Sequence, residues 1–429
     1  MDTSSISFDP QNIVPFESDS LPRVISEKFY LQHEKLFSHR KNEKHLVLGK
    51  KPSSQSLILQ SNDYLCLAKH PKIVNAQVNA LLSSHNDLIM SAVFLHEGSL
   101  KDRFEKKMAE YIGFEKAILT QSGWMANTGL LQVIADETIP VYIDFFAHMS
   151  LWEGVFTAKA KAYPFKHNSA DNLEKLIKKH GAGIIVVDSV YSTTGSVAPL
   201  IDIVHLAHQY DCVIVVDESH SLGTHGPSGA GLVAELNLTD KVHFITASLA
   251  KAFAGRAGII FCNEQVAHCF PYVSRPSIFS STLFDHEIAA LSATLEIIRD
   301  ADDRRQTLHK NARYLRQGLN ELGFNIESQS QIVSLASGAE SNTEQLRDAL
   351  ENKDIFGSVF CSPATPKNRS LVRFSINSGL TQYQLDVILS ACATIRDELK
   401  ILNWRSFRQK SLYKSAIENV SASSELIAE

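Results

Sequence analysis

A lysine among small apolar residues is the feature of this chain best suited to covalent chemistry. Lys251 stands in Ser248-Leu249-Ala250-Lys251-Ala252-Phe253-Ala254, where its neighbours would leave room for a flat ring bonded to the amine. Most lysines are solvated surface charges, but an apolar setting lowers the pKa of a lysine and makes it a nucleophile. The pattern favours a Schiff base between Lys251 and an aldehyde cofactor.

Two residues earlier in the chain, Asp217 and His220, fit the same kind of cofactor. Asp217 ends the apolar run Val213–Asp217, and His220 follows three positions later. Ligands of open α/β sheets bind beyond the carboxyl ends of strands. An aspartate there is often a turn or cap residue, and a lone histidine is more often structural. The combination with Lys251 is more specific, and it predicts pyridoxal phosphate (PLP), with Asp217 at the ring nitrogen and His220 at the ring oxygen.

Three other loops that follow apolar runs carry weaker signals. Gly123 and Trp124 open a helix after a strand, where free N–H groups suit a phosphate, although one glycine there is also ordinary turn chemistry. His148 would either stack on a cofactor ring or fill a loop. Ser192 would either reach the ring oxygen or be a turn residue.

Two motifs that suggest other ligands lack essential parts. The glycine-rich stretch 223–231 has neither the Lys-Ser/Thr of a Walker motif nor GxGxxG spacing, so it predicts a tight loop that shapes the site. His205, His208 and Cys212 have no fourth ligand in view, so we expect no metal site.

The elements that must hold these residues alternate between strands and helices. Short apolar runs, several with consecutive β-branched residues, predict buried strands of a mostly parallel sheet in an α/β fold. These runs are Ala117–Thr120, Pro140–Ile143, Ile184–Asp188, Val213–Asp217, Phe244–Thr246 and Gly258–Cys262. Apolar residues at helical spacing between Leu100 and Ile112, followed by Gly113, predict an amphipathic helix.

The sequence predicts four segments. They are an N-terminal arm (1–60), a large PLP-binding domain (61–295), a small C-terminal α+β domain (296–405) and a C-terminal tail (406–429). The arm carries one helix near Glu27–Phe37. The small domain begins with a long helix that ends at Gly323. Its other predicted elements are strands at Ile332–Leu335 and Leu371–Ile376 and a helix from about Thr381 to Leu399.

Composition excludes several classes of protein. The 429 residues carry a net charge of -5, from 42 basic and 47 acidic residues, which gives no sign of nucleic-acid or membrane-surface binding. The six cysteines are scattered without a CxxC pair, which is typical of a reduced, cytoplasmic protein. The N-terminus has no secretory or transit pattern, and no apolar run approaches the ~20 residues of a membrane span.

In order along the chain, these segments resemble the α-oxoamine synthase family of fold-type I PLP enzymes. The strongest stretches are Ser61–Leu65, Asp217–Gly223, Gly226–Gly231 and Ser248–Lys251. That family includes 8-amino-7-oxononanoate synthase, glycine C-acetyltransferase, 5-aminolevulinate synthase and serine palmitoyltransferase. The resemblance implies a large domain with a mostly parallel seven-stranded sheet, and a homodimer with active sites at the interface.

The resemblance also implies roles for single residues around the cofactor. Lys251 would hold PLP as a Schiff base, Asp217 would pair with the ring nitrogen, and His148 would stack on the ring. His220 and Ser192 would lie near the ring oxygen. The phosphate would be met by the backbone amides of Gly123 and Trp124, by the Ser248 hydroxyl and, from the partner subunit, by Ser281.

The implied reaction is an acyl transfer. Asn62 would approach the substrate, and Arg373 would clamp its carboxylate. An amino acid or S-adenosylmethionine would displace Lys251, which would then remove the Cα proton as a general base. Cα would attack an acyl-CoA with loss of CoA and CO2, and His148 would hydrogen-bond the acyl carbonyl.

Two departures from the family pattern narrow the expected function. Asn86–Leu95 replaces the Gly/Ser-rich stretch of glycine-using members, and Cys66 stands where they have glycine. Both look like the quorum-sensing autoinducer synthases, which make medium-chain α-aminoketone or α-hydroxyketone signal precursors. Two alternatives stay open. One is a glycine- or alanine-using enzyme such as 8-amino-7-oxononanoate synthase, and the other is a non-catalytic partner subunit, against which Lys251, Asp217 and His220 together speak.

Overall fold

The computed structural model describes residues 21–38, 44–83 and 89–404. The chain divides into two compact units, Met1–Lys50 and Lys51–Glu429. In the first unit, α1 (Arg23–His33) continues into a π-helical turn, Glu34–Ser38. This helix begins earlier than the predicted Glu27–Phe37, directly after Pro22, a residue that suits a helix start because its φ is already fixed. The four predicted segment boundaries stay a prediction.

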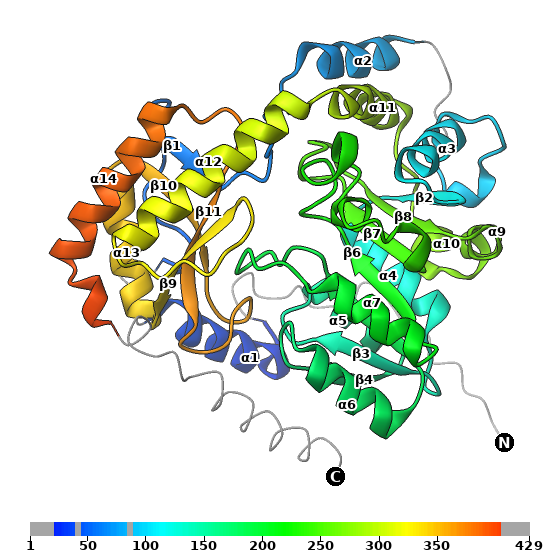
Figure 1. Cartoon of the computed structure of the whole chain (residues 1–429), viewed down its shortest axis with the longest axis horizontal. Coiled ribbons are helices and arrows are strands. Elements are labelled where there is room, and N and C mark those ends of the chain that lie inside the picture. The colour runs from blue at the N-terminus through cyan, green and yellow to red at the C-terminus, as the bar shows by residue number, and fades with distance from the viewer. Residues whose placement is uncertain (1–20, 39–43, 84–88, 405–429) are drawn as a thin grey trace, which may run out of the picture. The chain divides into compact units, whose positions relative to one another are not determined.

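A mostly parallel sheet of seven strands forms the larger part of the second unit within the described residues (Figure 1). Its spatial order is β2 (Lys116–Thr120), β8 (Gly258–Cys262), β7 (Phe244–Ser248), β6 (Val213–Asp217), β5 (Ile184–Asp188), β3 (Pro140–Asp144) and β4 (Lys161–Phe165). Only β8 runs opposite to the others in this sheet. The predicted seven-stranded, mostly parallel sheet is therefore confirmed.

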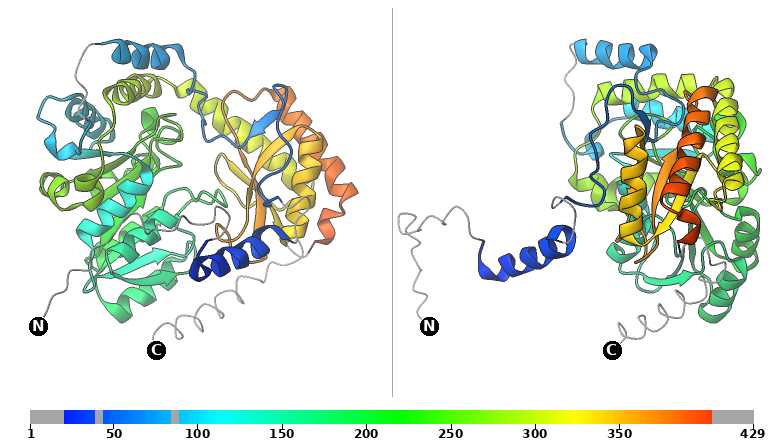
Figure 2. Two further views of the ribbon diagram at one scale, coloured as in Figure 1. Left: turned by 180° about the vertical axis from the view of Figure 1, so that it is seen from behind. Right: turned by 90° about the vertical axis from the view of Figure 1, so that its left-hand side faces the viewer.

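Both faces of this sheet are covered, which explains the consecutive apolar residues of its strands. On β5, Val186 belongs to the core beneath α4 (Gly123–Ile134) and α5 (Met149–Thr157). Its neighbour Val187 belongs to the core on the other face, beneath α3 (Leu100–Ile112), α6 (Ala170–His180) and α7 (Leu200–Gln209). Figure 2 shows the helices on the two sides of the strands.

A second sheet has the order β1 (Leu57–Leu59), β10 (Ile355–Phe360), β11 (Ser370–Ser375) and β9 (Ile332–Gly338). Two helices, α12 (Asp302–Glu321) and α13 (Glu340–Asn352), pack against it, and α14 (Gln382–Glu398) packs against those helices. The predicted helix from Thr381 is confirmed, because Thr381 caps α14 and forms a capping box with Gln384. β1 precedes the large sheet in sequence but pairs in parallel with β10.

Sequence reasoning missed β1, β4, β10 and α13. β4 is an edge strand of sequence Lys-Ala-Tyr-Pro-Phe, and only its last residue is buried. Proline is tolerated at a sheet edge, and an edge strand needs no continuous apolar run. The remaining helices are α2 (Pro71–Leu82), α8 (Leu232–Glu235), α9 (Glu264–Val273), α10 (Arg275–Phe279) and α11 (Asp285–Arg299). Among the described helices, none combines the length and apolar composition that a membrane crossing requires.

Candidate active site

The residues predicted to do chemistry follow the carboxyl ends of neighbouring parallel strands. Asp188 ends β5 and Asp217 ends β6, and the two pair in register across the sheet. Ser248 ends β7, the next strand, and Lys251 follows in the loop after it. Because these strands are parallel, their ends meet at one edge of the sheet. The structure therefore brings Asp217, Ser248 and Lys251 together, as the sequence predicts.

Lys251 lines a cavity of about 300 Å³ whose wall also includes Asn62 and Arg256. Burial lowers the pKa of the Lys251 ammonium group, the nearby Asp217 carboxylate opposes this, and the Arg373 guanidinium adds to it. A lowered pKa increases the fraction of free amine, which is the form that attacks a carbonyl and accepts a proton.

Asp217 is buried, and two donors hold its carboxylate. Its Oδ1 accepts from the Ser219 N–H at 2.8 Å, and its Oδ2 accepts from the Asn127 side-chain amide at 2.7 Å. The two donors fix the orientation of the carboxylate, which suits an aspartate that would pair with a ring nitrogen. Sequence reasoning missed Asn127. The signal for it was its spacing, because it lies one helical turn after Gly123 on the same face of α4.

His148 is the N-cap residue of α5, in the loop after β3. Its backbone N–H donates to Asp188 Oδ2 at 2.9 Å, and its Nδ1 lies 2.8 Å from Ser150 Oγ. The Trp124 ring meets it edge-on, with the two ring centroids 6.3 Å apart. Burial lowers the pKa of His148, and the Asp217 carboxylate opposes this. The Lys251 ammonium adds to the effect of burial.

Arg373 and Asn62, both predicted to meet the substrate, contact each other. Arg373 lies on β11 and donates from Nη2 to Asn62 Oδ1 at 2.9 Å and from Nη1 to the Ser192 carbonyl oxygen at 2.7 Å. Its Nε is buried and has no hydrogen-bond partner among the described residues. A buried donor without a partner costs about 1–3 kcal/mol. A substrate carboxylate would satisfy this group.

His220 belongs to the same cluster. Its Nδ1 lies 2.7 Å from the Tyr64 hydroxyl, which lies 3.2 Å from Asn62 Oδ1. Burial holds the pKa of His220 well below its usual value, and the Lys251 ammonium adds to this. Burial also raises the pKa of Tyr64. Tyr64 lies in the Ser61–Leu65 stretch that carries the family resemblance, but the sequence alone assigns it no role.

Gly123 packs directly against Ser248. A Cβ at Gly123 would lie only 2.5 Å from Ser248 Cβ, so glycine is what lets the start of α4 approach the end of β7. The first N–H groups of a helix have no partner within the helix. The N–H groups of Gly123 and Trp124 and the Ser248 hydroxyl would therefore make a cradle for a phosphate. This cradle, with an aspartate and a lysine on the neighbouring loops, fits PLP.

Ser281 lies beside Gln121, which comes two residues before Gly123. Its carbonyl oxygen accepts from Gln121 Nε2 at 2.7 Å, and it forms an isolated β-bridge with Ser91. Residues 86–88 of the departing stretch Asn86–Leu95 lie outside the described residues. Its described part carries three exposed apolar side chains, Ile89, Met90 and Phe94. The role of Ser281 toward a partner subunit stays a prediction.

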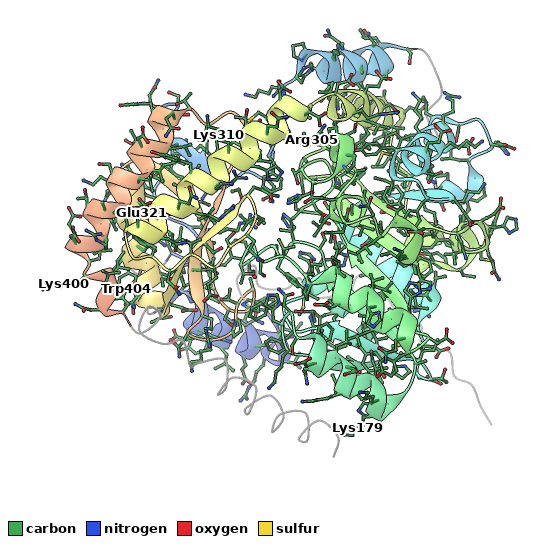
Figure 3. All side chains as sticks on the ribbon, viewed as in Figure 1. Lys179, Arg305, Lys310, Glu321, Lys400 and Trp404 are labelled. Atoms are coloured by element: carbon green, nitrogen blue, oxygen red, sulfur yellow. The ribbon has the colours of Figure 1, made fainter. Side chains whose placement is uncertain are left out.

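The glycine-rich stretch 223–231 is a tight loop over a buried carboxyl group. Gly231 has a φ of +102°, and a Cβ there would lie 1.5 Å from Glu218 Oε2. Glu218 Oε1 accepts from the Val233 N–H at 2.8 Å, and burial raises the pKa of Glu218 to about 8. Arg305 lies near the start of α12 beside the loop, with Nη1 3.5 Å from the Gly223 carbonyl oxygen (Figure 3).

The histidines considered as metal ligands have other surroundings. His208 Nε2 lies 2.9 Å from the Lys241 carbonyl oxygen, and Cys212 is buried. Within residues 21–38, 44–83 and 89–404, no group of three or more His, Cys, Asp or Glu side chains has a metal-binding arrangement.

Known proteins similar in sequence share most of this chain. The aminotransferase class I and II family matches residues 54–391. The CAI-1 autoinducer synthase of Vibrio campbellii is 53% identical over 364 residues, which cover 85% of this chain and 92% of that protein. The 8-amino-7-oxononanoate synthase of Petrotoga mobilis is 31% identical, over 80% of this chain and 88% of that protein.

Solved structures share the fold. Serine palmitoyltransferase of Sphingomonas wittichii matches with a TM-score of 0.78 and 24% identity, over 88% of this chain and 97% of that one. A second serine palmitoyltransferase structure, which contains PLP, matches with a TM-score of 0.78 and 23% identity, over 88% of this chain and 98% of that one. The chain therefore belongs to the aminotransferase class I and II family, in which it is a PLP-dependent acyltransferase of the α-oxoamine synthase type.

Proposed function

We propose that this enzyme joins a medium-chain acyl-CoA to an amino acid or S-adenosylmethionine, with loss of CoA and CO2. The product would be an α-aminoketone or α-hydroxyketone precursor of an autoinducer. The 53% identity to CAI-1 autoinducer synthase supports the autoinducer branch. The observation that carries the proposal is the pairing of Lys251, whose pKa is lowered, with the buried Arg373, whose Nε has no hydrogen-bond partner in the described part of the chain.

Several residues of the chain would bind the amino donor and remove its Cα proton. PLP, when bound to Lys251, supplies a ring that withdraws electrons from the Cα of the amino acid. Asp217 would hold the ring nitrogen protonated. Arg373, which Asn62 and the Ser192 carbonyl orient, would bind the substrate carboxylate. Lys251 would then accept the Cα proton as a free amine, because its pKa is lowered.

Other residues would place the cofactor and the acyl group. Gly123, Trp124 and Ser248 would bind the phosphate. His220 and the Ser192 side chain would lie near the ring oxygen. His148 would stack on the ring and donate a hydrogen bond to the acyl carbonyl, so that CoA leaves as the new carbon–carbon bond forms. These roles follow from the family resemblance, and the clustering of the residues supports them.

A homodimer would complete the site, with Ser281 reaching the phosphate bound to the partner subunit. The surface around Ser281 supports this proposal. Ser281 bridges to Ser91, and the Ser91 hydroxyl donates to the Ser277 carbonyl oxygen at 2.8 Å. Large apolar side chains nearby in sequence are exposed in the single chain, namely Ile89, Met90, Phe94 and Phe279. Large exposed apolar side chains gathered near one segment are typical of an interface.

The proposal is tested by substrate profiling. The purified enzyme is given acyl-CoAs of several chain lengths with each candidate amino acid or S-adenosylmethionine, and CoA release and product mass are measured. We expect release with a medium-chain acyl-CoA and an amino donor larger than alanine, and none from the Lys251→Ala variant. Turnover confined to glycine or alanine would contradict the proposal. It would favour the second candidate, a function like that of 8-amino-7-oxononanoate synthase, which the 31% identity supports.

A further inference from the structure

A continuous row of hydrogen bonds links Thr246, on β7, to His148. The Thr246 hydroxyl donates to Asn127 Oδ1 at 2.6 Å. The Asn127 side-chain nitrogen lies 2.7 Å from Asp217 Oδ2 and 2.8 Å from Ser150 Oγ. Ser150 Oγ in turn lies 2.8 Å from His148 Nδ1. Thr246, Asn127, Asp217 and Ser150 are all buried, so water does not replace these partners.

The direction of each bond follows from the chemistry of its members. An ionised carboxylate only accepts hydrogen bonds, so the group of Asn127 that faces Asp217 must be the NH2. Its two hydrogens are then used by Asp217 and Ser150, and its oxygen is left to accept from Thr246. Ser150 Oγ therefore accepts from Asn127. Its single hydrogen is free for His148 Nδ1.

A second donor converges on the same ring nitrogen. The backbone N–H of Ser150 points at His148 Nδ1 at 3.3 Å, because His148 is the N-cap of α5. A nitrogen that accepts from two donors carries no proton. The positive end of α5 also disfavours the imidazolium form. In the described part of the chain, the side-chain hydrogen bonds of His148 all use Nδ1, which leaves Nε2 for a ligand.

We propose that Asn127 and Ser150 are positioning residues that hold His148 as a neutral imidazole with its proton on Nε2. His148 then donates a hydrogen bond to a carbonyl oxygen of the substrate and cannot take up a proton there, so Lys251 is left as the base. The identity of that oxygen as the thioester carbonyl rests on the proposed function. The tautomer of His148 does not rest on the proposed function, because the protein's own hydrogen bonds set it.

The tautomer of His148 can be read directly by NMR. The holoenzyme is labelled with ¹⁵N-histidine, and the His148 signals are assigned by their loss in the His148→Asn variant. The wild-type enzyme at pH 8 is expected to show a protonated Nε2 and an unprotonated Nδ1. Ser150→Ala should shift the signals toward a mixture of tautomers, and Ser150→Thr, which keeps the hydroxyl, should restore the wild-type pattern.

Kinetics provide a second readout with a matched control. Ser150→Ala should lower kcat by roughly 2- to 10-fold, the worth of one hydrogen bond, with little change in KM for the amino donor. Ser189→Ala removes an equally buried hydroxyl that bonds the Asp217 carbonyl oxygen at 3.0 Å but does not touch His148. That variant should keep the wild-type tautomer.

Each outcome separates this inference from the proposed function. A wild-type His148 protonated on Nδ1, or a Ser150→Ala variant with an unchanged tautomer, would overturn it whatever the substrates are. A protonated Nε2 in an enzyme that turns over only glycine or alanine would support the inference while the autoinducer proposal fails.

Discussion

Replacing Gly123 with alanine tests the phosphate cradle most sharply. The added Cβ would lie 2.5 Å from Ser248 Cβ and 2.9 Å from Ser248 Cα, whereas carbon atoms in contact lie about 3.5–4.0 Å apart. The start of α4 and the end of β7 must therefore separate by about 1 Å. Overpacking of this kind costs about 1–3 kcal/mol. The separation also moves the Gly123 and Trp124 N–H groups away from the Ser248 hydroxyl.

A phosphate bound by both elements loses affinity when they separate. If most of that cost falls on the bound state, the affinity for PLP falls roughly 10- to 100-fold, because each factor of ten corresponds to about 1.4 kcal/mol. Titration of the apoenzyme with PLP, followed by visible absorbance, measures this change. Gly129→Ala is the matched control on the same helix, because its Cβ would meet Ser274 Oγ at 2.8 Å and the Phe270 ring at 3.2 Å, away from the cradle. Unchanged PLP affinity in Gly123→Ala would refute the assignment of this cradle to the phosphate.

Three further predictions concern the buried carboxyl group, the carboxylate clamp and the dimer. Burial raises the pKa of Glu218 from 4.5 to about 8, so the stability from its protonated form is complete below pH 4.5 and is lost as the pH rises through 8. Glu218→Gln should therefore raise the free energy of unfolding at pH 7 by roughly 3 kcal/mol and flatten the fall of this free energy between pH 5 and pH 8. Urea unfolding at a series of pH values measures this, and equal pH slopes for the variant and the wild-type protein would contradict it. Arg373→Lys should lower kcat/KM for the amino donor by roughly 100-fold and leave PLP affinity unchanged. A lysine ammonium is a point charge without the planar fork that lets Arg373 bond Asn62 and the Ser192 carbonyl and still present Nε to a carboxylate, and an unchanged kcat/KM would count against the clamp. Heterodimers of Lys251→Ala with Ser281→Ala should contain one intact site and exceed either homodimer in activity. A heterodimer with only half the activity of the Ser281→Ala homodimer would show that Ser281 does not act across the interface.

The central sheet was predictable because burial on both faces leaves a simple mark in the sequence. β5 and β6 are runs of apolar, mostly β-branched residues, and each ends at an aspartate. The edge strand β4 lacks this mark because one side of it meets no further strand, and it contains Pro164. β10 was missed because it contains Gly357 and Ser358 and only its first three residues are buried. α13 was missed because its buried face includes the polar residues Thr343, Arg347 and Glu351.

Residues of the site that lie at strand ends were predictable, but the partners that hold them were not. Asp217 and Lys251 stand out because each is a charge beside an apolar run. Asn127 contacts Asp217 from 90 residues earlier in the chain, and Tyr64 contacts His220 across 156 residues. The spacing of Asn127 from Gly123 places it on the right face of α4, but no local pattern identifies the partner of Asn127 or of Tyr64, because the fold alone brings these residues together.

Covalent attachment of PLP to Lys251 is tested most directly by reducing the holoenzyme with borohydride and locating the modified lysine by peptide mass spectrometry. We predict that the pyridoxyl group is found on the peptide that contains Lys251, and that the Lys251→Ala variant carries none. A pyridoxyl group on another lysine, or its absence from the reduced wild-type enzyme, would contradict the assignment.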